Sequence, residues 1–379
     1  MGWISCLPRK SGDAPPGETN HKVLHPIRGG PSPKETHIVT MKKYSIVEML
    51  GDGISAELSE SVHAVASALP FAIEFDQADI SLENRDAKGM GIYDTVMEKM
   101  NEHKVAMKYP TATVTESPNK VLREMCDFAV IHRPVMTMPG VENNFKKSID
   151  IDVVRIATGG TYGDRGRRIG NHSAVSLRVI EHGPATLAAR FAFKLSMIRN
   201  SHVVSASKYT IQAAADGLFE EAVETISHQY PGIAYRRELF DAMLAGIIMF
   251  PERYGVIVTP NEYGDFLSDM LCGLIGSIGL GDSSSYAFDE DGDVTLSMFD
   301  PAGGTAPDIA GKGVCNPAAA LLAFGSLVRH LGEINHGESI RAAVRDCIAA
   351  GDKTGDIGGE LGCQAFTEAV IKRLGATTA

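Results

Sequence analysis

The stretch YGVIVTPNEYGDFLSDMLCGLIG, residues 254–276, contains a short apolar run followed by a longer amphipathic segment. The run VIVT is rich in β-branched residues, as in a buried strand, and the apolar residues after Pro260 recur at helical spacing. The stretch therefore predicts a strand followed directly by a helix, with Asp265 and Asp269 on one face of the first turn of that helix.

The same alternation extends over most of the chain and predicts an α/β fold. Further apolar runs are YSIVEML (44–50), FAIEFDQADI (71–80), FAVIHRPV (128–135) and VVSAS (203–207). Several runs end at a polar residue, and α/β proteins place ligand-binding groups at strand ends. These residues are Arg133, Arg155, Lys208 and Asn261. No G-x-G-x-x-G motif follows the first run, which argues against a Rossmann fold.

Composition excludes several classes of function. With 379 residues, 44% of them hydrophobic, the chain is long enough for two lobes. A net charge of −11 argues against a nucleic-acid surface, and no apolar stretch reaches the roughly 20 residues of a membrane span. The six cysteines lack metal-binding spacing, which indicates reduced thiols in a cytoplasmic protein. Residues 1–40 are rich in Pro, Gly and polar groups and are expected to form a disordered extension.

Asp265 and Asp269 are candidate metal ligands. Carboxylate oxygens at this spacing suit Mg²⁺ or Mn²⁺. An acidic pair at a helix start also complements the helix dipole, so this pair alone does not establish a metal site.

Candidate substrate-binding residues lie in SPNKVLREMCDFAVIHRPV, residues 117–135. The planar fork of arginine binds carboxylates through two parallel hydrogen bonds. Any single arginine is better explained by a surface ion pair, but several at successive strand ends favour an anionic substrate. The candidates are Ser117, Asn119, Arg123, Arg133 and, after the next apolar run, Arg155.

Tyr162 follows Arg155 by one loop. Neighbouring cationic groups would lower the pKa of its phenol, which could then act as a proton donor or relay. A packed loop aromatic is the alternative for this residue.

Several motifs occur in an order that resembles the family of isocitrate, isopropylmalate, homoisocitrate and tartrate dehydrogenases. They are GDGISAEL (51–58), KYPTAT (108–113), SPNKVLR (117–123), HRPV (132–135), RIATGGTY (155–162), SASKYTI (205–211), TPNEYGDFLSD (259–269) and GGTAPDIAGKGVCNP (303–317). The resemblance covers about residues 41–335 and implies a two-lobed fold of that family. The large, cofactor-binding lobe would comprise residues 41–137 and 272–379. The small lobe, residues 138–271, would carry the dimer contacts.

The resemblance also implies roles for single residues. Arg123, Arg133 and Arg155 would hold the carboxylates of a small hydroxy di- or tricarboxylate. Asp241, Asp265 and Asp269 would chelate the Mg²⁺ or Mn²⁺. Asp241 and Lys208 would come from the neighbouring subunit, so that a homodimer shares its active sites. Lys208, with its pKa lowered by nearby cationic charge, would take the hydroxyl proton, and Tyr162 would help to protonate the enol after decarboxylation.

The segment GGTAPDIAGKGVCNP resembles the adenosine-binding loop of the same family. The cofactor contacts implied are Thr113, Gly304, Thr305, Ala306, Asp308, Ile309 and Asn316. Asp308 stands where members that use NAD have an aspartate, and a carboxylate there would repel the 2′-phosphate of NADP. Gly303 replaces the usual histidine, which removes a contact on the adenine side.

The expected reaction is NAD- and metal-dependent oxidative decarboxylation of a 3-substituted malate. Ser117 and Asn119 match the isocitrate-type pattern, so isocitrate, homoisocitrate and phosphonomethylmalate are the first candidates. Ile156 replaces a frequent glutamate, and RIATGGTY resembles isopropylmalate enzymes, so isopropylmalate or tartrate dehydrogenase is an alternative. The basic loop with Arg165, Arg167 and Arg168 either meets a more anionic substituent or is a solvated turn. A non-catalytic regulatory subunit is a third possibility, although all the residues implied for catalysis and metal binding are present.

Overall fold

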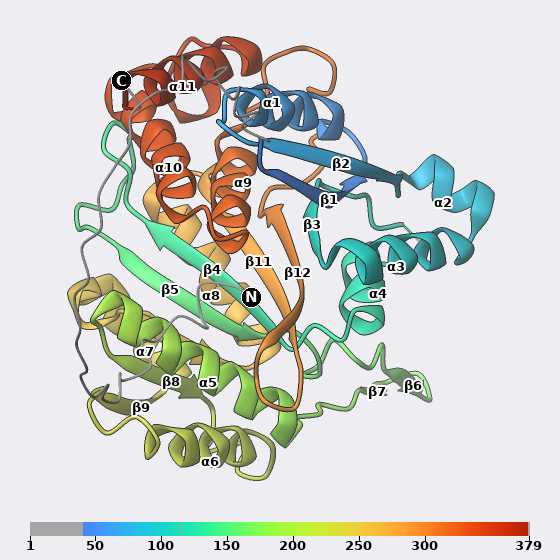
Figure 1. Ribbon diagram of the computed structural model, residues 1–379. Helices are drawn as coiled ribbons and strands as arrows, with labels where there is room; N and C mark the ends of the chain where they lie inside the picture. Colours follow the sequence, from blue (N-terminus) through green and yellow to red (C-terminus); the bar gives the residue numbers. More distant parts are fainter. Residues whose placement is uncertain (1–40, 115, 378–379) are drawn as a thin grey trace, which may run out of the picture.

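A computed structural model describes residues 41–114 and 116–377, so the extension predicted for residues 1–40 lies outside the described residues. Ten strands form one sheet in the order β2-β1-β3-β12-β11-β4-β5-β10-β8-β9 (Figure 1). Their bounds are β1 (Lys43–Leu50), β2 (Ala72–Asp79), β3 (Val105–Lys108), β4 (Val130–Met136), β5 (Asp150–Ile156), β8 (Val203–Ser207), β9 (Tyr235–Leu239), β10 (Val256–Thr259), β11 (Asp282–Phe288) and β12 (Val294–Pro301). β6 (Arg167–Ile169) and β7 (Ser173–Val175) form a separate hairpin.

Helices connect the strands and pack on the sheet. They are α1 (Ser55–Ser67), α2 (Leu82–Lys88), α3 (Gly91–His103), α4 (Pro118–Met125), α5 (His182–Arg199), α6 (Ala215–Ser227), α7 (Phe240–Met249), α8 (Asn261–Ile275), α9 (Ala318–His330), α10 (Ile334–Ala349) and α11 (Cys363–Thr377). The sheet is mixed, because β4 runs antiparallel to both β5 and β11. The α/β fold class is therefore confirmed, with a sheet order that is not that of a Rossmann fold.

The two predicted lobes supply two contiguous blocks of this sheet. Residues 41–137 and 272–379 contribute β2, β1, β3, β12, β11 and β4, and residues 138–271 contribute β5, β10, β8 and β9. The proposed boundary thus falls between two neighbouring strands of a continuous sheet, and relative motion of the two blocks stays a prediction.

Side chains of β4 and β5 alternate between the two faces of the sheet. Arg133 and Arg155 lie on the face that α8 covers, where Arg133 donates to Ser268 and Arg155 donates to Asn261. His132 lies on the other face, with its ring 5.6 Å from that of Phe191 on α5. One pair of strands therefore carries polar residues to both sides of the molecule.

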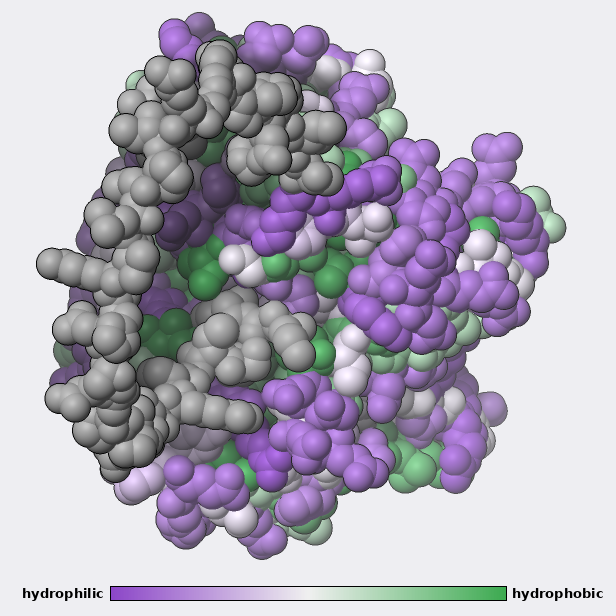
Figure 2. All heavy atoms as spheres, in the orientation of Figure 1, coloured by the Kyte–Doolittle hydropathy of each residue, from purple (hydrophilic) through white to green (hydrophobic). Residues whose placement is uncertain are grey.

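Two hydrophobic clusters form the core. The larger runs under α1, α5, α9 and α10, and a smaller one lies under α3 and α4. On β1, Ile46 belongs to the first and Val47 to the second, as strand alternation requires. In the view of Figure 2, hydrophilic residues dominate the outer surface and hydrophobic ones show mainly toward the middle.

The acidic pair lies deeper in its helix than the sequence predicted. The strand and helix predicted at residues 254–276 are β10 and α8, but α8 begins at Asn261, so Asp265 and Asp269 lie in its second and third turns and not in its first. The shared face is confirmed, because Arg133 Nη1 lies 3.5 Å from Asp265 Oδ1 and 3.2 Å from Asp269 Oδ1.

Two further sequence predictions concern reduced cysteines and membrane-spanning segments. The five cysteines that fall within residues 41–114 and 116–377 are all buried and unbridged. In the same ranges, no helix combines the length and apolar character needed to cross a membrane.

Candidate active site

A cavity of about 400 Å³ brings together eight of the residues singled out from the sequence. It lies between α4, β4, β5, the loop after β5 and the start of α8. These eight lining residues are Ser117, Asn119, Arg123, Arg133, Arg155, Tyr162, Asn261 and Asp265. The three arginines and Asp265 are distant in sequence but lie around one cavity, as the sequence predicted.

Arg155 is the most buried of the three arginines, with 1% of its surface exposed. Its Nε donates to Asn261 Oδ1 at 2.9 Å and its Nη1 donates to Asp265 Oδ1. Gly264 permits this arrangement, because a Cβ at that position would lie 2.6 Å from Arg155 Cβ. The segment NEYGD is therefore built to receive the Arg155 side chain from β5.

Arg133 links β4 to α8. Its Nη1 donates to Ser268 Oγ at 2.7 Å and to Asp269 Oδ1 at 3.2 Å. The prediction that Arg133 ends its strand is wrong: it lies in the middle of β4, because this antiparallel strand continues to Met136 opposite β5. Arg133 reaches the site because its side chain points from the sheet face toward α8, not because the strand stops there.

Ser117 and Arg123 occupy opposite ends of α4. The Ser117 side chain caps the helix by accepting from Lys120 N at 3.4 Å, and Pro118 follows in the first helical position, where proline costs no hydrogen bond. Arg123 lies one to two turns further on, facing the cavity. Burial, followed by the charge of Arg133, lowers the pKa of Arg123.

The site holds more positive charge than its own carboxylates offset. Burial, followed by the charges of Arg123 and Arg133, lowers the pKa of Arg155 to about 9. Two buried polar atoms at the cavity, Asn119 Oδ1 and Arg133 Nε, have no hydrogen-bond partner among the residues that the structure describes. An anion with several oxygen atoms would lower the electrostatic cost of this arrangement.

The prediction that Tyr162 is acidified by its cationic neighbours is wrong within this chain. Its hydroxyl donates to Asp265 Oδ2 at 3.0 Å, and the side chain is 39% exposed. Burial and the nearby Asp265 carboxylate raise the pKa of Tyr162 to about 12, and the opposing influence of Arg155 is smaller. Tyr162 is therefore protonated near neutral pH and suited to donate a proton rather than to accept one.

Asp265 is ionised in this setting. Burial alone would raise its pKa, but the charges of Arg155 and Arg133 and the hydrogen bond from Tyr162 outweigh burial and lower it. The carboxylate thus meets two arginines and a phenol, and any metal ion bound there would share it with these groups.

Lys208 and Asp241 do not line the cavity of their own chain. Lys208 directly follows β8, and its Nζ lies 2.9 Å from Asp241 Oδ1 on α7. Within one chain its ion-pair partner is therefore a carboxylate, and the predicted action of Lys208 in the site of a neighbouring subunit stays a prediction. Within residues 41–114 and 116–377, no three His, Cys, Asp or Glu side chains come together as a metal site.

The candidate cofactor loop lies at the carboxyl ends of three neighbouring strands. β1, β3 and β12 are parallel neighbours, and each continues into one of the segments 51–53, 109–113 and 302–317. Ile54 N donates to Thr305 O at 3.0 Å, and Gly53, with a φ of 61°, leaves no room for a Cβ beside that carbonyl. Thr113 and Asp308 are both exposed.

Glu57 shapes this loop and was missed by the sequence reasoning. Its two carboxylate oxygens accept from Gly311 N at 2.9 Å and Gly313 N at 2.8 Å. Asn316 donates to Asp356 and accepts from Ala318 N. The motif GDGISAEL contained Glu57, but only its pairing with distant backbone amides shows what the residue does.

Asn261 and Ser268 are two further residues whose function was missed. Each holds one of the arginines in place, Asn261 through Arg155 and Ser268 through Arg133. The spacing of the NEYGDFLSD motif offered a signal, because Asn261, Asp265 and Ser268 follow at helical intervals and therefore share one face.

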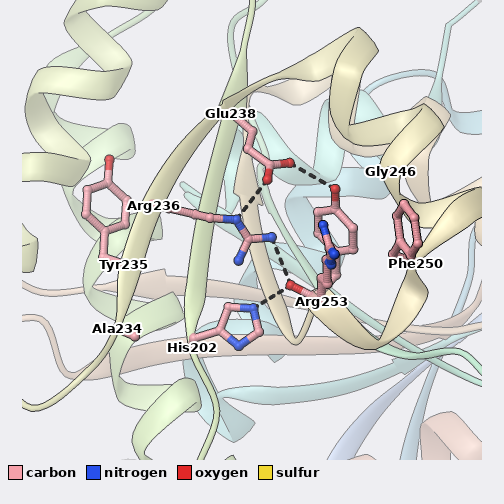
Figure 3. Close-up of a pocket in the computed structure, with 9 residues that line it drawn as sticks. His202, Ala234, Tyr235, Arg236, Glu238, Gly246, Phe250 and Arg253 are labelled. Atoms are coloured by element: carbon pink, nitrogen blue, oxygen red, sulfur yellow. Dashed lines mark hydrogen bonds and ion pairs between the residues drawn. The ribbon is translucent and has the colours of Figure 1, made fainter.

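A second cavity, of about 450 Å³, lies beside β9 and α7 and contains none of the predicted site residues. Figure 3 shows its charged groups satisfying one another. Arg236 Nε pairs with Glu238 Oε1 at 2.8 Å, and Tyr254 donates to Glu238 Oε2 at 3.0 Å. His202 Nε2 lies 2.7 Å from Arg253 O. The first cavity, in contrast, gathers three arginines around one space.

Comparison with known proteins shows the family of this chain. A family model described as isocitrate/isopropylmalate dehydrogenase matches residues 43–370. The chain is 33% identical to isocitrate dehydrogenase [NAD] subunit 2, mitochondrial, of Kluyveromyces lactis, covering 91% of this chain and 93% of that protein. It is 32% identical to a mitochondrial isocitrate dehydrogenase [NAD] regulatory subunit of Dictyostelium discoideum, covering 88% and 93%. It is 30% identical to isocitrate/homoisocitrate dehydrogenase of Thermus thermophilus, covering 87% and 98%.

The fold comparison points the same way. The crystal structure of isocitrate dehydrogenase from Methylococcus capsulatus superimposes with a TM-score of 0.80 at 26% identity, covering 87% of this chain and 99% of that one. The chain belongs to the isocitrate/isopropylmalate dehydrogenase family.

Proposed function

We propose that the chain is a dehydrogenase that oxidises and decarboxylates a 3-substituted malate, with isocitrate or a close analogue as substrate, using NAD and a divalent cation. The observation that carries the proposal is the convergence of Arg123, Arg133 and Arg155 with Tyr162 and Asp265 around one cavity. Three guanidinium groups lining one cavity can bind two or three carboxylates of one small molecule. The names of relatives from Kluyveromyces lactis and Thermus thermophilus support isocitrate or homoisocitrate.

The polar end of the cavity supports a substituent with a carboxylate. Ser117, Asn119 and Lys120 line the cavity, and all three offer hydrogen-bonding or charged groups. A branched alkyl substituent, as in isopropylmalate, would offer no hydrogen bond to Asn119, whose Oδ1 is buried and has no partner among the described residues. The geometry therefore favours isocitrate or homoisocitrate over isopropylmalate.

The proton balance of the reaction requires one acceptor and one donor. Loss of hydride and of CO₂ leaves the hydroxyl proton to be removed and one proton to be delivered to carbon, so the net change in protons is zero. Tyr162, protonated near neutral pH, is suited to the delivery. Lys208 of the partner subunit would take the hydroxyl proton, since this chain's own Lys208 does not line the cavity.

The acidic residues fit a divalent cation only if a second chain completes the site. Asp265 and Asp269 share a face of α8 and offer the oxygen atoms that Mg²⁺ and Mn²⁺ prefer. The partner subunit's Asp241 would be the third carboxylate. When bound, the cation would supply charge stabilisation at the substrate oxygens. The exposed loop around Asp308, held by Glu57, would take the adenosine half of NAD.

Exposed apolar residues on α7 and α8 support pairing of two chains. Ile248 and Met249 on α7 and Phe266 on α8 are at least half exposed. Burying them against a second copy would bring its α7, with Asp241, toward this site. A homodimer is the simplest arrangement, and a complex with a different subunit is the alternative that the names of several relatives favour.

A regulatory subunit is the second candidate function, because one relative carries that name. Such a chain would bind the hydroxy acid without turning it over. The presence of Tyr162, Lys208, Asp241, Asp265 and Asp269 favours an active enzyme.

The test is NADH formation by the purified full chain with Mn²⁺, NAD or NADP, and isocitrate, homoisocitrate, isopropylmalate or tartrate. We expect NAD-dependent turnover of isocitrate or homoisocitrate, abolished by a chelator. Asp265→Asn should lower kcat/KM by about 100-fold or more, since it removes a carboxylate that meets two arginines. Asp94→Asn, on the exposed side of α3, is the matched control and should change little.

Two other outcomes have distinct meanings. Binding of isocitrate by calorimetry without turnover, together with a dimer in light scattering, would identify a regulatory subunit. Neither binding nor turnover of any acid would refute the proposal.

A further inference from the structure

A separate cavity of about 230 Å³ lies on the face of the sheet opposite the candidate active site. His132 and Pro134 of β4 and Asp152 of β5 form its floor, whereas Arg133 and Arg155 of the same strands point to the other face. Its walls come from α5 on one side and from α9 and α10 on the other. Figure 1 shows β4 and β5 passing between these helices. We call it the back cavity.

Four arginines line the back cavity: Arg199, Arg329, Arg341 and Arg345. Only two carboxylates, Asp152 and Glu338, line it with them among the residues that the structure describes. Arginines gathered around one cavity in excess of the carboxylates are the usual composition of a site for phosphate or carboxylate groups.

Three of these arginines have acidic partners that hold them in place. Arg199 pairs with Asp152 and lies 2.6 Å from Asp150. Arg341 Nη1 donates to Asp282 Oδ2 at 2.7 Å, and Arg329 Nε lies 2.9 Å from Glu338 Oε1. Their guanidinium groups are thus oriented before any ligand arrives, which reduces the entropic cost of binding.

Arg345 differs from the other three. It is half-buried and forms no hydrogen bond or ion pair with any residue of the described ranges. Burial, followed by the charge of Arg341, lowers the pKa of Arg345, and the charges of Glu338, Asp346 and Asp282 oppose this shift only in part. A half-buried arginine that lines the same cavity as three others is electrostatically unfavourable, and an anion bound beside it would relieve that cost.

We propose that the back cavity binds a small anion carrying two or more negative charges on phosphate or carboxylate groups. A volume of about 230 Å³ corresponds to roughly seven or eight waters at ~30 Å³ each, enough for a pyrophosphate or a tricarboxylate and too little for a dinucleotide. The inference does not depend on the function proposed for the other face.

Such an anion would join the two blocks of the sheet. Arg199 belongs to residues 138–271, whereas Arg341 and Arg345 belong to the other block. An anion bound to both sides would resist their separation, and it would act on β4 and β5, the strands that carry Arg133 and Arg155. The back cavity is therefore placed to couple ligand binding to the spacing of the active-site arginines.

The test is calorimetric titration of the full chain with inorganic pyrophosphate and, separately, with tricarballylate, a tricarboxylate without a hydroxyl group to oxidise. Arg345→Gln should weaken the back-cavity binding of one or both anions by roughly 10- to 100-fold, the effect of losing one charge-assisted hydrogen bond. Lys88→Gln, which removes an exposed positive charge on α2, is the control and should change binding less than about threefold. Any anion binding at the active-site arginines is the same in the parent, Arg345→Gln and Lys88→Gln proteins, so it does not contribute to the difference between them.

A second pair of variants adds a charge instead of removing one. Ile198 lines the cavity and is 51% exposed, and its neighbour Met197, 45% exposed, does not line it. Ile198→Glu should weaken binding about tenfold by repulsion, and Met197→Glu should not.

The outcomes separate the two sources of anion. Dependence on Arg345 and Ile198 for pyrophosphate alone identifies a phosphate site, and dependence for tricarballylate alone identifies a carboxylate site. If both variants bind both anions as the parent and control proteins do, the back cavity is not an anion site.

Discussion

Replacing Gly264 by alanine tests how closely α8 must approach β5. The added Cβ would lie 2.6 Å from Arg155 Cβ and 2.7 Å from its Cγ. These are the first atoms of a side chain that is 1% exposed and cannot swing away as a flexible end would. The helix therefore has to shift from the strand, and the contacts of Arg155 with Asn261 and Asp265 on that helix have to stretch.

The expected change in the free energy of unfolding follows from two opposing effects. Overpacking of a buried site costs about 1–3 kcal/mol. Alanine is favoured over glycine within a helix by about 1 kcal/mol, which offsets part of that cost. Gly273→Ala is the matched control on the same helix, because a Cβ there meets nothing within 4 Å. The two variants should differ in free energy of unfolding by about 1–3 kcal/mol, with Gly264→Ala the less stable.

The assay is urea unfolding of both variants under identical conditions, followed by steady-state kinetics with the substrate that the parent enzyme uses. Gly264→Ala should unfold at lower urea and show a raised KM, since Arg155 is displaced, whereas Gly273→Ala should keep the parent KM. Equal unfolding midpoints and equal KM values would show that α8 can move without affecting Arg155, and the account of this contact would be wrong.

Three further predictions concern single side chains. Tyr162→Phe removes a half-exposed hydrogen bond to Asp265 and should change the unfolding midpoint little. If the phenol delivers the proton, kcat should fall by about 10²–10⁴-fold. A kcat within threefold of the parent would exclude that role. The folded-state pKa of Asp265 is depressed, so its stabilising contribution is present above the ordinary pKa of 3.8 and is lost as pH falls through the lower folded value. The stability difference between the parent and Asp265→Asn should therefore shrink in urea titrations carried out below about pH 4, and a difference that grows on acidification would contradict the lowered pKa. Glu57→Gln retains one acceptor oxygen for Gly311 and Gly313 in place of two. It should weaken NAD binding about threefold to tenfold in a fluorescence titration and leave the affinity for the hydroxy acid unchanged. Unchanged NAD affinity would mean that Glu57 does not shape the cofactor loop.

Much of the fold was predictable because the signals are local. The apolar run at 256–259 and the helical spacing after it are properties of neighbouring residues, and they correctly predicted β10 followed by α8. The lack of a G-x-G-x-x-G motif after β1 correctly argued against a Rossmann fold. The grouping of Ser117, Asn119 and Arg123 on one helix followed from their short separation in the chain.

The tertiary structure decided what depends on pairing between distant segments. Arg133 lies in mid-strand because β4 runs antiparallel between β5 and β11, an order that local periodicity does not contain. The pKa of Tyr162 rises rather than falls because burial and the Asp265 carboxylate outweigh Arg155, a balance of distances across 103 residues of sequence. The same alternation of β4 and β5 that aims two arginines at the active site places the arginine-lined back cavity on the opposite face. Sequence thus determined which chemical groups this protein carries, and folding determined which of them meet, because electrostatic and packing energies depend on separation in space and not along the chain.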